Sequence, residues 1–230
     1  RHPFLYIAWY DFSLKRLLKK IKPDIFVGTN GMIPLNTQTK TLSVIHDLNF
    51  EHHPEHIPNL TRKYYCKYFP KFAREANRIA SVSEFSKKDI VDTYSIDENK
   101  IDVVYNGPNE QFQPISFEER VALQNKYSEG KPFFLFVGTL HPRKNLVNLF
   151  KAFNEFKSQT KIDFKLLIVG RKMWWTDEIE TTFQNLEFKN DIIFAGRLPE
   201  QELYKITAAA HTLTYVPIFE GFGIPLVEAM

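Results

Sequence analysis

Short apolar runs alternate with helical patterns along most of this chain, and that alternation limits the folds open to it. The clearest run covers residues 133–137, and a helical pattern with Leu146, Leu149 and Phe150 on one side follows it. A continuous apolar run is typical of a strand buried on both faces of a sheet. Strands that alternate with helices form βαβ units, which predict parallel sheets.

Two series of this kind follow one another. We predict two doubly wound α/β domains, at residues 1–113 and 132–230, with a linker and a short helix at residues 114–131. Residues 4–9 are apolar and are expected to form a strand or a packed turn. The remaining strands are expected at residues 24–29, 41–45, 78–83, 101–105, 133–138, 164–170, 191–196 and 212–216.

The composition excludes several classes of protein. A net charge of +3 suits an anionic ligand or a membrane surface, but it is too weak to indicate nucleic-acid binding. The single cysteine, Cys66, excludes an internal disulfide and favours a reducing compartment. No apolar run approaches the roughly 20 residues that span a bilayer. We therefore expect a cytoplasmic protein that associates at most peripherally with the membrane.

The ends of the predicted strands carry the chemistry. Arg143 and Lys144 stand between a strand and a helix, where two cations could clamp a phosphate or simply form a solvated basic loop. A second basic turn follows Gly170. The last twelve residues place Glu220 and Glu228 around a Gly-Phe-Gly turn and Pro225, a pattern of either a ligand site or a capped helix start.

Five segments of the chain form a recognisable set. They are SVIHD at residues 43–47, VSEFS at 82–86, VVYNG at 103–107, VGTLHPRKNL at 137–146, and FEGFGIP with the following EAM at 219–230. Together they resemble the pattern of glycosyltransferase family 4 (group 1). The resemblance implies the GT-B architecture, in which two Rossmann-like domains face a cleft, with the acceptor on the first domain and the nucleotide sugar on the second.

The resemblance also implies an activity and its ligands. It implies retaining transfer of a hexose, mannose or glucose, from a nucleoside diphosphate sugar to a saccharide or lipid-linked acceptor, with no cofactor and no essential metal. The chain contains no Asp-x-Asp pair to hold a cation, so protein charges must neutralise the departing diphosphate.

Carried over residue by residue, the resemblance assigns the site. Arg143 and Lys144 would hold the phosphates beside Gly138, and His46 would lie by the transferred sugar in a polar role. Glu220 would bind sugar hydroxyls and Glu228 ribose hydroxyls. The catalytic candidates are thus His46, Arg143, Lys144 and Glu220, and the other donor-binding candidates are Gly138, Leu198 at the base, Gly221, Phe222, Gly223 and Glu228.

Two further patterns have competing interpretations. His52, His53 and His56 could form a metal cluster, but Pro54 interrupts any helix that would bring His52 and His56 onto one face, so no metal site is predicted. A basic stripe on the expected helix at residues 60–76 could contact anionic lipid or be an ordinary solvated face. The stripe consists of Lys63, Lys67, Lys71 and Arg74.

Three functions remain open at this point. Besides the transferase, the motifs allow a nucleotide-sugar epimerase of the same architecture, or a non-catalytic nucleotide-sugar-binding module. The chain begins at Arg1 without the glycine-rich loop that opens family members, and it stops at Met230 soon after Glu228. We therefore expect a fragment of a larger enzyme.

Overall fold

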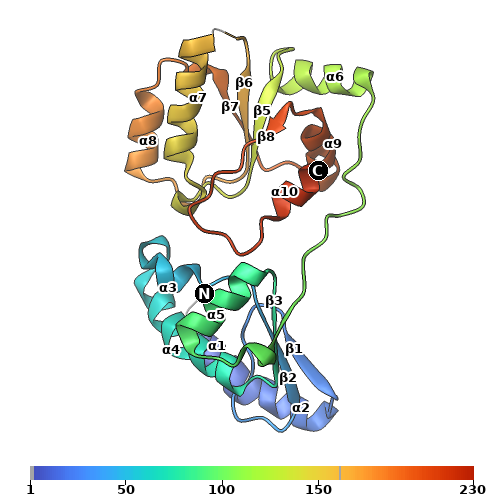
Figure 1. Cartoon of the computed structure of the whole chain (residues 1–230), viewed down its shortest axis with the longest axis vertical. Helices are drawn as coiled ribbons and strands as arrows, with labels where there is room; N and C mark the ends of the chain where they lie inside the picture. Colours follow the sequence, from blue (N-terminus) through green and yellow to red (C-terminus); the bar gives the residue numbers. More distant parts are fainter. Residues whose placement is uncertain (1–2, 161) are drawn as a thin grey trace. The chain divides into compact units, whose positions relative to one another are not determined.

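The computed structural model describes residues 3–160 and 162–230, and it divides into two compact units. Residues 1–106 with Glu220–Phe222 make up the first unit, and residues 107–219 with Gly223–Met230 make up the second. Each unit is a parallel α/β structure and is described by itself (Figure 1).

The first unit is built on a sheet of four parallel strands in the order β1-β2-β3-β4. In this register Ile45, at the end of β2, is opposite Ser81, at the end of β3. The carboxyl ends of the strands therefore meet at one edge, where His46 and Ser83 follow. The strands are β1 Ile25–Gly28, β2 Lys40–Ile45, β3 Arg78–Ser81 and β4 Ile101–Val103.

Aromatic residues of the longest helix, α4, fill the core of this unit. Tyr64, Phe69 and Phe72 are buried there against Ile45 and Ile79 of the sheet. The helical segments are α1 Pro3–Ala8, η1 Trp9–Leu14, α2 Lys15–Ile21, α3 Asn49–His52, η2 Pro54–His56, α4 Asn59–Glu75, α5 Glu84–Tyr94 and η3 Glu98–Lys100.

The expectation for residues 4–9 is wrong, because they form helix. α1, the π-helical segment η1 and α2 follow one another without a break from Pro3 to Ile21, and Leu14 and Leu18 are buried. A short apolar run cannot by itself distinguish a strand from a buried helix. In this segment apolar residues continue at helical spacing through Leu18, as the helical structure requires.

The second unit has its strands in the order β7-β6-β5-β8, all parallel. The chain thus moves outward from β5 through β6 to β7 and then returns to the other side of β5, which creates a topological switch point between β5 and β8. In sheets of this kind ligands bind at the carboxyl ends of the strands near such a point. The strands are β5 Phe133–Val137, β6 Lys165–Val169, β7 Ile192–Gly196 and β8 Thr212–Leu213.

Helices cover both faces of this second sheet (Figure 1). α7 and α8 bury one core with Phe150 at its centre, and α9 closes the other core over Leu135 and Leu167. Every residue of β6 is buried, as expected for a central strand. The helical segments are α6 Phe117–Tyr127, η4 Pro142–Lys144, α7 Leu146–Thr160, α8 Asp177–Gln184, η5 Lys189–Asp191, α9 Glu200–Ala209 and α10 Ile224–Ala229.

Residues 114–131, where we expected a linker with a short helix, count with the second unit, and the helix is α6. α6 begins with a capping box in which the Ser116 hydroxyl accepts from the backbone N–H of Glu119. Leu123 and Tyr127 pack against the core beneath α9. Lys205 of α9 pairs with Glu119 at 2.8 Å.

The predicted fold class is confirmed as α/β with parallel sheets. Within residues 3–160 and 162–230, no helix has both the length and the apolar character that crossing a membrane requires.

Candidate donor and acceptor site

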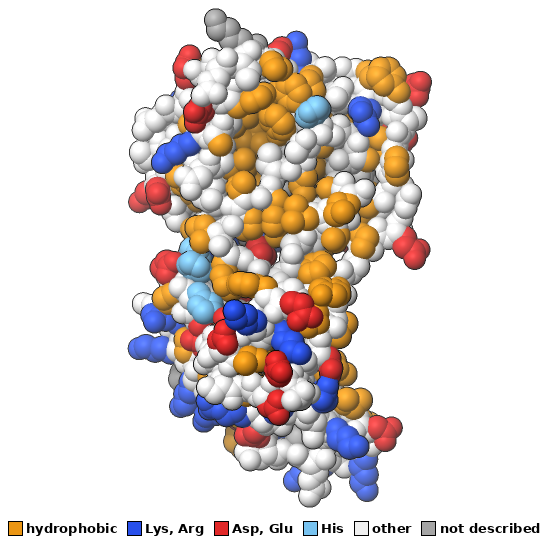
Figure 2. All heavy atoms as spheres, viewed as in Figure 1, with side chains coloured by type: hydrophobic (Ala, Val, Ile, Leu, Met, Phe, Trp, Pro, Cys, Tyr) orange, Lys and Arg blue, Asp and Glu red, His pale blue; other side chains and the backbone are white. Residues whose placement is uncertain are grey.

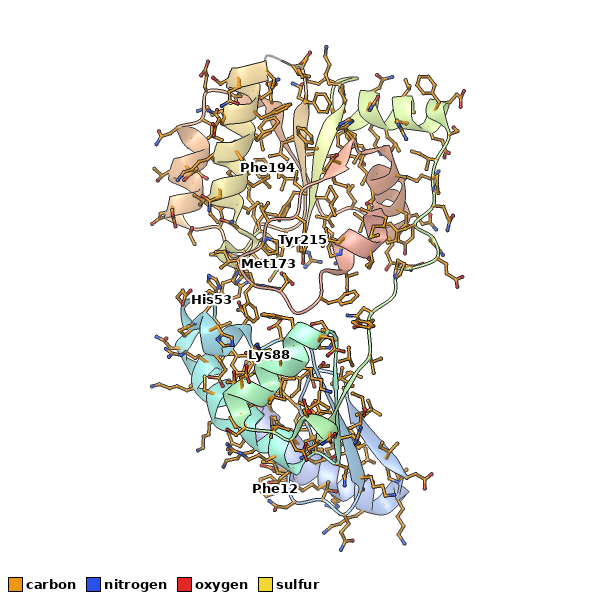
Figure 3. All side chains as sticks on the ribbon, in the orientation of Figure 1. Phe12, His53, Lys88, Met173, Phe194 and Tyr215 are labelled. Atoms are coloured by element: carbon orange, nitrogen blue, oxygen red, sulfur yellow. The ribbon has the colours of Figure 1, made fainter. Side chains whose placement is uncertain are left out.

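A pocket of about 960 Å³ opens at the carboxyl ends of β5, β6 and β7 in the second unit. Its wall continues onto the first turn of α9 with Glu200 and Leu203. Figure 3 labels Met173 at this end of the sheet. Phe194 is in the middle of β7, among the side chains of the core. The pocket therefore lies where the strand order predicts a ligand.

Gly138 and Gly170, which follow the adjacent strands β5 and β6, line the floor of this pocket. The N–H of Gly138 donates to the carbonyl of Val169 at 2.9 Å, and the N–H of Gly170 donates to the carbonyl of Gly196 at 2.8 Å. A Cβ added to Gly170 would lie 1.7 Å from the carbonyl oxygen of Gly138. Only glycine permits backbones to approach this closely, so the floor is flat and lined by peptide groups.

Two arginines give the pocket its charge. Arg171 follows β6, Arg197 follows β7, and both line the pocket together with Leu198. A guanidinium remains charged at all physiological pH values and matches the geometry of phosphate oxygens. Lys172 belongs to the same basic turn, but its Nζ lies 4.1 Å from the ring centre of Trp175. Arg171 of this basic turn therefore lines the pocket, whereas Lys172 stacks on an aromatic ring.

The predicted phosphate clamp lies beside the switch point. Arg143 and Lys144 form η4 after β5, and Asn145 then adopts a left-handed conformation with φ 61° before α7. The Arg143 carbonyl accepts from the N–H of Ile218 at 2.8 Å, and its guanidinium donates to the carbonyl of Phe219 at 3.4 Å. These bonds hold the basic turn against the segment that follows β8.

Lys144 lies near Tyr215 and Gly138. Its Nζ lies 5.9 Å from the ring centre of Tyr215, a residue labelled in Figure 3. Its Cε would be 3.7 Å from a Cβ added to Gly138. Gly138 therefore belongs both to the pocket floor and to the surroundings of Lys144.

Glu228 is not among the residues that line the large pocket. α10 begins after Gly223, whose φ is 100°, and carries Pro225 in its first turn, as the sequence predicts. Glu228 lines a separate pocket of about 250 Å³ with Tyr204 of α9. Burial raises the pKa of the Glu228 carboxyl above its usual value.

In the first unit His46 directly follows β2 and is exposed. Its Nε2 lies 2.9 Å from the carbonyl oxygen of Thr29. Since a carbonyl only accepts, Nε2 carries the proton, and Nδ1 is the acceptor nitrogen of the neutral ring. The bond fixes both the orientation and the tautomer of the imidazole.

Gly221 packs closely against the backbone of His46. The three residues Glu220–Phe222 count with the first unit, and a Cβ on Gly221 would lie 1.9 Å from the His46 carbonyl oxygen. The hydroxyls of Ser83 and Ser86 donate to the carbonyl of Gly221. Ser83 also caps α5, as predicted, by accepting from the N–H of Ser86. Phe222 lies 6.2 Å from Tyr105 between ring centres.

The structure therefore places the predicted residues in several groups. Gly138 and Leu198 line the large pocket; Arg143 and Lys144 lie at the switch point; Gly223 caps α10, which carries Glu228; and His46, Glu220, Gly221 and Phe222 belong to the first unit. The basic turn after Gly170, which contains Arg171, was noted in the sequence, but neither Arg171 nor Arg197 was among the candidate site residues. The signal for both was their position just after a predicted strand.

The comparisons with known proteins agree with this organisation. Residues 118–230 match the family model of group 1 glycosyl transferases, and residues 1–112 match that of Glycosyltransferase Family 4. The two matches together leave out only residues 113–117. The chain belongs to this glycosyltransferase family.

Curated relatives and solved structures extend the likeness. The chain is 27% identical to the O-antigen chain mannosyltransferase B of Escherichia coli over 100% of its own length and 61% of that protein. It is 29% identical to the O-antigen chain mannosyltransferase RfbU of Salmonella typhimurium, over 97% of the chain and 59% of that protein. The chain thus spans about 60% of the length of these relatives.

A solved structure supports the fold in three dimensions. The crystal structure of Anabaena HepE in complex with UDP and glucose superposes with a TM-score of 0.76 at 17% identity, covering 94% of this chain and 59% of that one. At this identity the likeness establishes the fold only.

Proposed function

We propose that this protein is a retaining glycosyltransferase that moves a hexose from a nucleoside diphosphate sugar to a saccharide or lipid-linked acceptor. The observation that carries the proposal is the pocket at the strand ends of the second unit, lined by Arg171 and Arg197, with Arg143 and Lys144 at the neighbouring switch point. Four cations around one end of a sheet suit a diphosphate.

The size and lining of the pocket support a nucleotide sugar as the ligand. A volume of about 960 Å³ is at the upper end of the range for small-molecule sites. Leu198 offers an apolar surface to a base, and the lack of side chains at Gly138 and Gly170 allows close approach of phosphates. Anabaena HepE, of similar fold, was solved with UDP and glucose.

Mannose is the favoured sugar of the two that the motifs allow. The relatives from Escherichia coli and Salmonella typhimurium are both named as O-antigen chain mannosyltransferases. Those names also favour a growing saccharide chain as acceptor. Nothing favours the epimerase alternative.

The proposed chemistry assigns charge stabilisation to side chains and helix ends. As the diphosphate leaves, negative charge grows on its oxygens while the sugar gains oxocarbenium character. Arg143 and Lys144 precede α7, whose N-terminal N–H groups add partial positive charge in the same place. Fixed positive groups of this kind stabilise developing charge and replace a metal ion in that role.

His46 is proposed to bind the transferred sugar. The bond from Nε2 to Thr29 leaves the acceptor nitrogen Nδ1 to receive a sugar hydroxyl in the neutral ring. Glu220 and Glu228 are proposed to bind sugar and ribose hydroxyls, since each carboxylate can accept bonds from a vicinal diol.

Peripheral membrane contact is a further proposal for the first unit. Basic side chains are spread over the visible face of this unit (Figure 2), and those of α4 are exposed. They are Arg62, Lys63, Lys67, Lys71 and Arg74. Such a face would be attracted to anionic lipids that carry an acceptor. Flotation with anionic liposomes at low salt tests this contact, and an unbound protein would contradict it.

Donor binding and transfer are tested separately. Calorimetric titration with GDP- and UDP-linked mannose and glucose should show binding of at least one donor, followed by transfer to a saccharide acceptor with the anomeric configuration retained in the product. Donor binding without transfer would favour the non-catalytic binding module. No binding of any donor would contradict both functions.

His46→Ala separates the sugar-binding role from donor binding. We expect turnover to fall by about 100-fold or more, in the range for a lost transition-state contact, with donor affinity nearly unchanged. His52→Ala is the matched control, since His52 pairs with Asp89 at 2.6 Å on another part of the unit. Full turnover in His46→Ala would contradict the role.

A further inference from the structure

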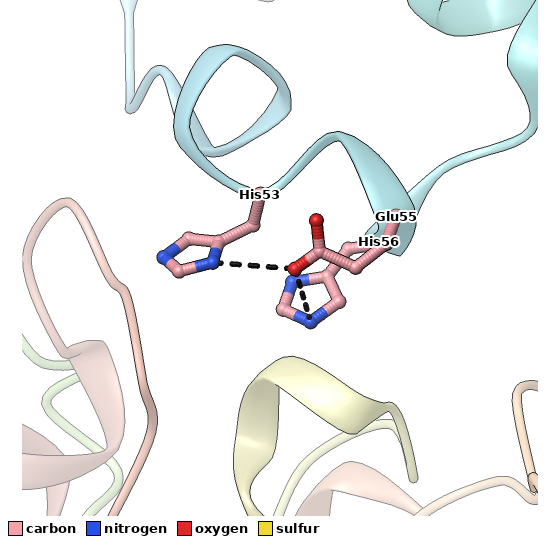
Figure 4. Close-up of side chains that lie close together, drawn as sticks. All are labelled: His53, Glu55 and His56. Atoms are coloured by element: carbon pink, nitrogen blue, oxygen red, sulfur yellow. Dashed lines mark ion pairs between the residues drawn. The ribbon is translucent and has the colours of Figure 1, made fainter.

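The turn between α3 and α4 gathers His53, Glu55 and His56 (Figure 4). The Oε1 atom of Glu55 lies 3.4 Å from Nδ1 of His53 and 3.5 Å from Nε2 of His56. One ligand atom from each of the three residues lies within 4.8 Å of the others. Figure 4 shows both imidazoles turned toward the carboxylate from the same side of the turn.

The local backbone explains this arrangement. Pro54 ends α3 but begins the 3-10 helix η2, and the N–H of His56 donates to the carbonyl of His53 at 3.0 Å. In a 3-10 helix residues three apart are eclipsed. The rings of His53 and His56 therefore stack, 5.1 Å between centres and inclined by 19°.

The two histidines that stack are not the pair that an α-helix would bring together. An α-helix would place His52 beside His56, four residues along the chain. His52 instead contacts Asp89 of α5 at 2.6 Å. Proline prevents the α-helical pairing, and by starting a 3-10 turn it creates the pairing of His53 with His56.

We propose that His53, Glu55 and His56 form a binding site for a divalent transition-metal ion of the zinc class. A tetrahedral ion with bonds of about 2.0–2.2 Å holds its ligand atoms roughly 3.3–3.6 Å apart. Two of the three separations, 3.4 and 3.5 Å, fall in that range. Imidazole nitrogens select zinc over magnesium or calcium, which prefer sets of oxygen ligands.

The bound ion would fasten the turn that joins α3 to α4. Its three ligands come from four consecutive residues between the end of α3 and the start of α4. A fourth position remains for water or another ligand. The role is structural, since the ion stabilises the folded first unit, and it is independent of the charge stabilisation proposed for hexose transfer.

The test uses the full chain after treatment with a chelator. Zinc chloride should bind with one ion per chain in calorimetry and should raise the melting temperature, whereas magnesium chloride should not. Cobalt(II), which reports its geometry, should give the visible absorption of a tetrahedral site. Absence of both zinc binding and the tetrahedral cobalt spectrum would overturn the proposal.

Variants of the three proposed ligands test where the ion binds. His53→Ala, His56→Ala and Glu55→Gln should each weaken zinc binding by more than about 100-fold, since even loss of an outer-shell partner costs 10- to 100-fold. His52→Ala is the matched control and should bind zinc like the parent chain. Glu55 is 63% exposed, so Glu55→Gln is decisive if a histidine variant fails to fold. Unchanged affinity in Glu55→Gln, or equal loss in His52→Ala, would refute the site.

Discussion

The carboxyl edges of both sheets are formed by the ends of parallel strands, but the residues that follow those strands differ. In the second unit Gly138, Gly170 and Gly196 end adjacent strands, and Arg171 and Arg197 line the pocket above them. In the first unit the backbone of Gly221 is packed against the His46 carbonyl, and serine hydroxyls bind it.

This difference separates the contribution of the fold from that of individual residues. Both edges arise from parallel strands whose ends meet, yet one combines peptide groups with cations and the other combines an imidazole with hydroxyls. Cations suit a diphosphate, whereas neutral acceptors and donors suit sugar hydroxyls. The chemistry therefore depends on the few residues that follow each strand.

The largest effect is expected from Gly170→Ala. The new Cβ would lie 1.7 Å from the Gly138 carbonyl oxygen, so β5 and β6 would have to separate at the pocket floor. We expect the free energy of unfolding to fall by about 3 kcal/mol or more, measured by calorimetric melting. An unchanged melting temperature would show that the floor is not closely packed.

Variants of two other glycines provide comparisons for Gly170→Ala. Gly221→Ala also meets backbone, the His46 carbonyl oxygen at 1.9 Å, but its segment lies outside any strand and can shift at lower cost. Gly107 has no atom within 4 Å of an added Cβ. Gly107→Ala should therefore leave stability unchanged or raise it by about 0.4–1 kcal/mol.

A smaller effect is expected on donor affinity when the pocket loses a charge. Arg171→Ala and Arg197→Ala should each weaken binding of a nucleoside diphosphate by about tenfold, since a bond to a charged group contributes roughly 1.5 kcal/mol or more. The comparison is with Lys172→Ala, whose ammonium stacks on Trp175 and Phe194. Equal losses in all three, measured by calorimetry, would contradict the assignment of the pocket.

The smallest effect concerns Glu228, which lines the second pocket of that unit. Burial raises the pKa of Glu228, so the folded state holds this proton more tightly than the unfolded state. The stability that this group contributes is present below its unfolded pKa and is lost as pH rises through its folded value. Melting temperatures of the parent chain should decline over that interval relative to Glu228→Gln. Parallel pH profiles would contradict the raised pKa.

Apolar patterning was sufficient to predict most of the fold. Runs such as Phe133–Val137 and residues 166–169 predict strands because the strands of a sheet covered on both faces are apolar on both sides. The segment at residues 4–9 was misassigned because its run is too short to separate helix from strand. The short helix expected within residues 114–131 is confirmed as α6, which begins with the capping box of Ser116 and Glu119.

Side-chain direction was the part that sequence could not supply. Arg171 and Lys172 are neighbours, yet one lines the pocket and the other stacks on Trp175. Glu228 was predicted at the ribose, but its surroundings depend on where α10 starts and how it packs near α9. Such choices depend on tertiary contacts that the pattern of residues does not encode.

The capped helix α6 determines where a recombinant fragment of the second unit should begin. A recombinant fragment that starts at Pro132 would lack Leu123 and Tyr127, and it would uncover the apolar surface of α9 that they cover. Exposed apolar surface of this kind promotes aggregation. A fragment intended to isolate the second unit should therefore begin before Ser116, and a protease should cut more readily upstream of that residue than within the helix.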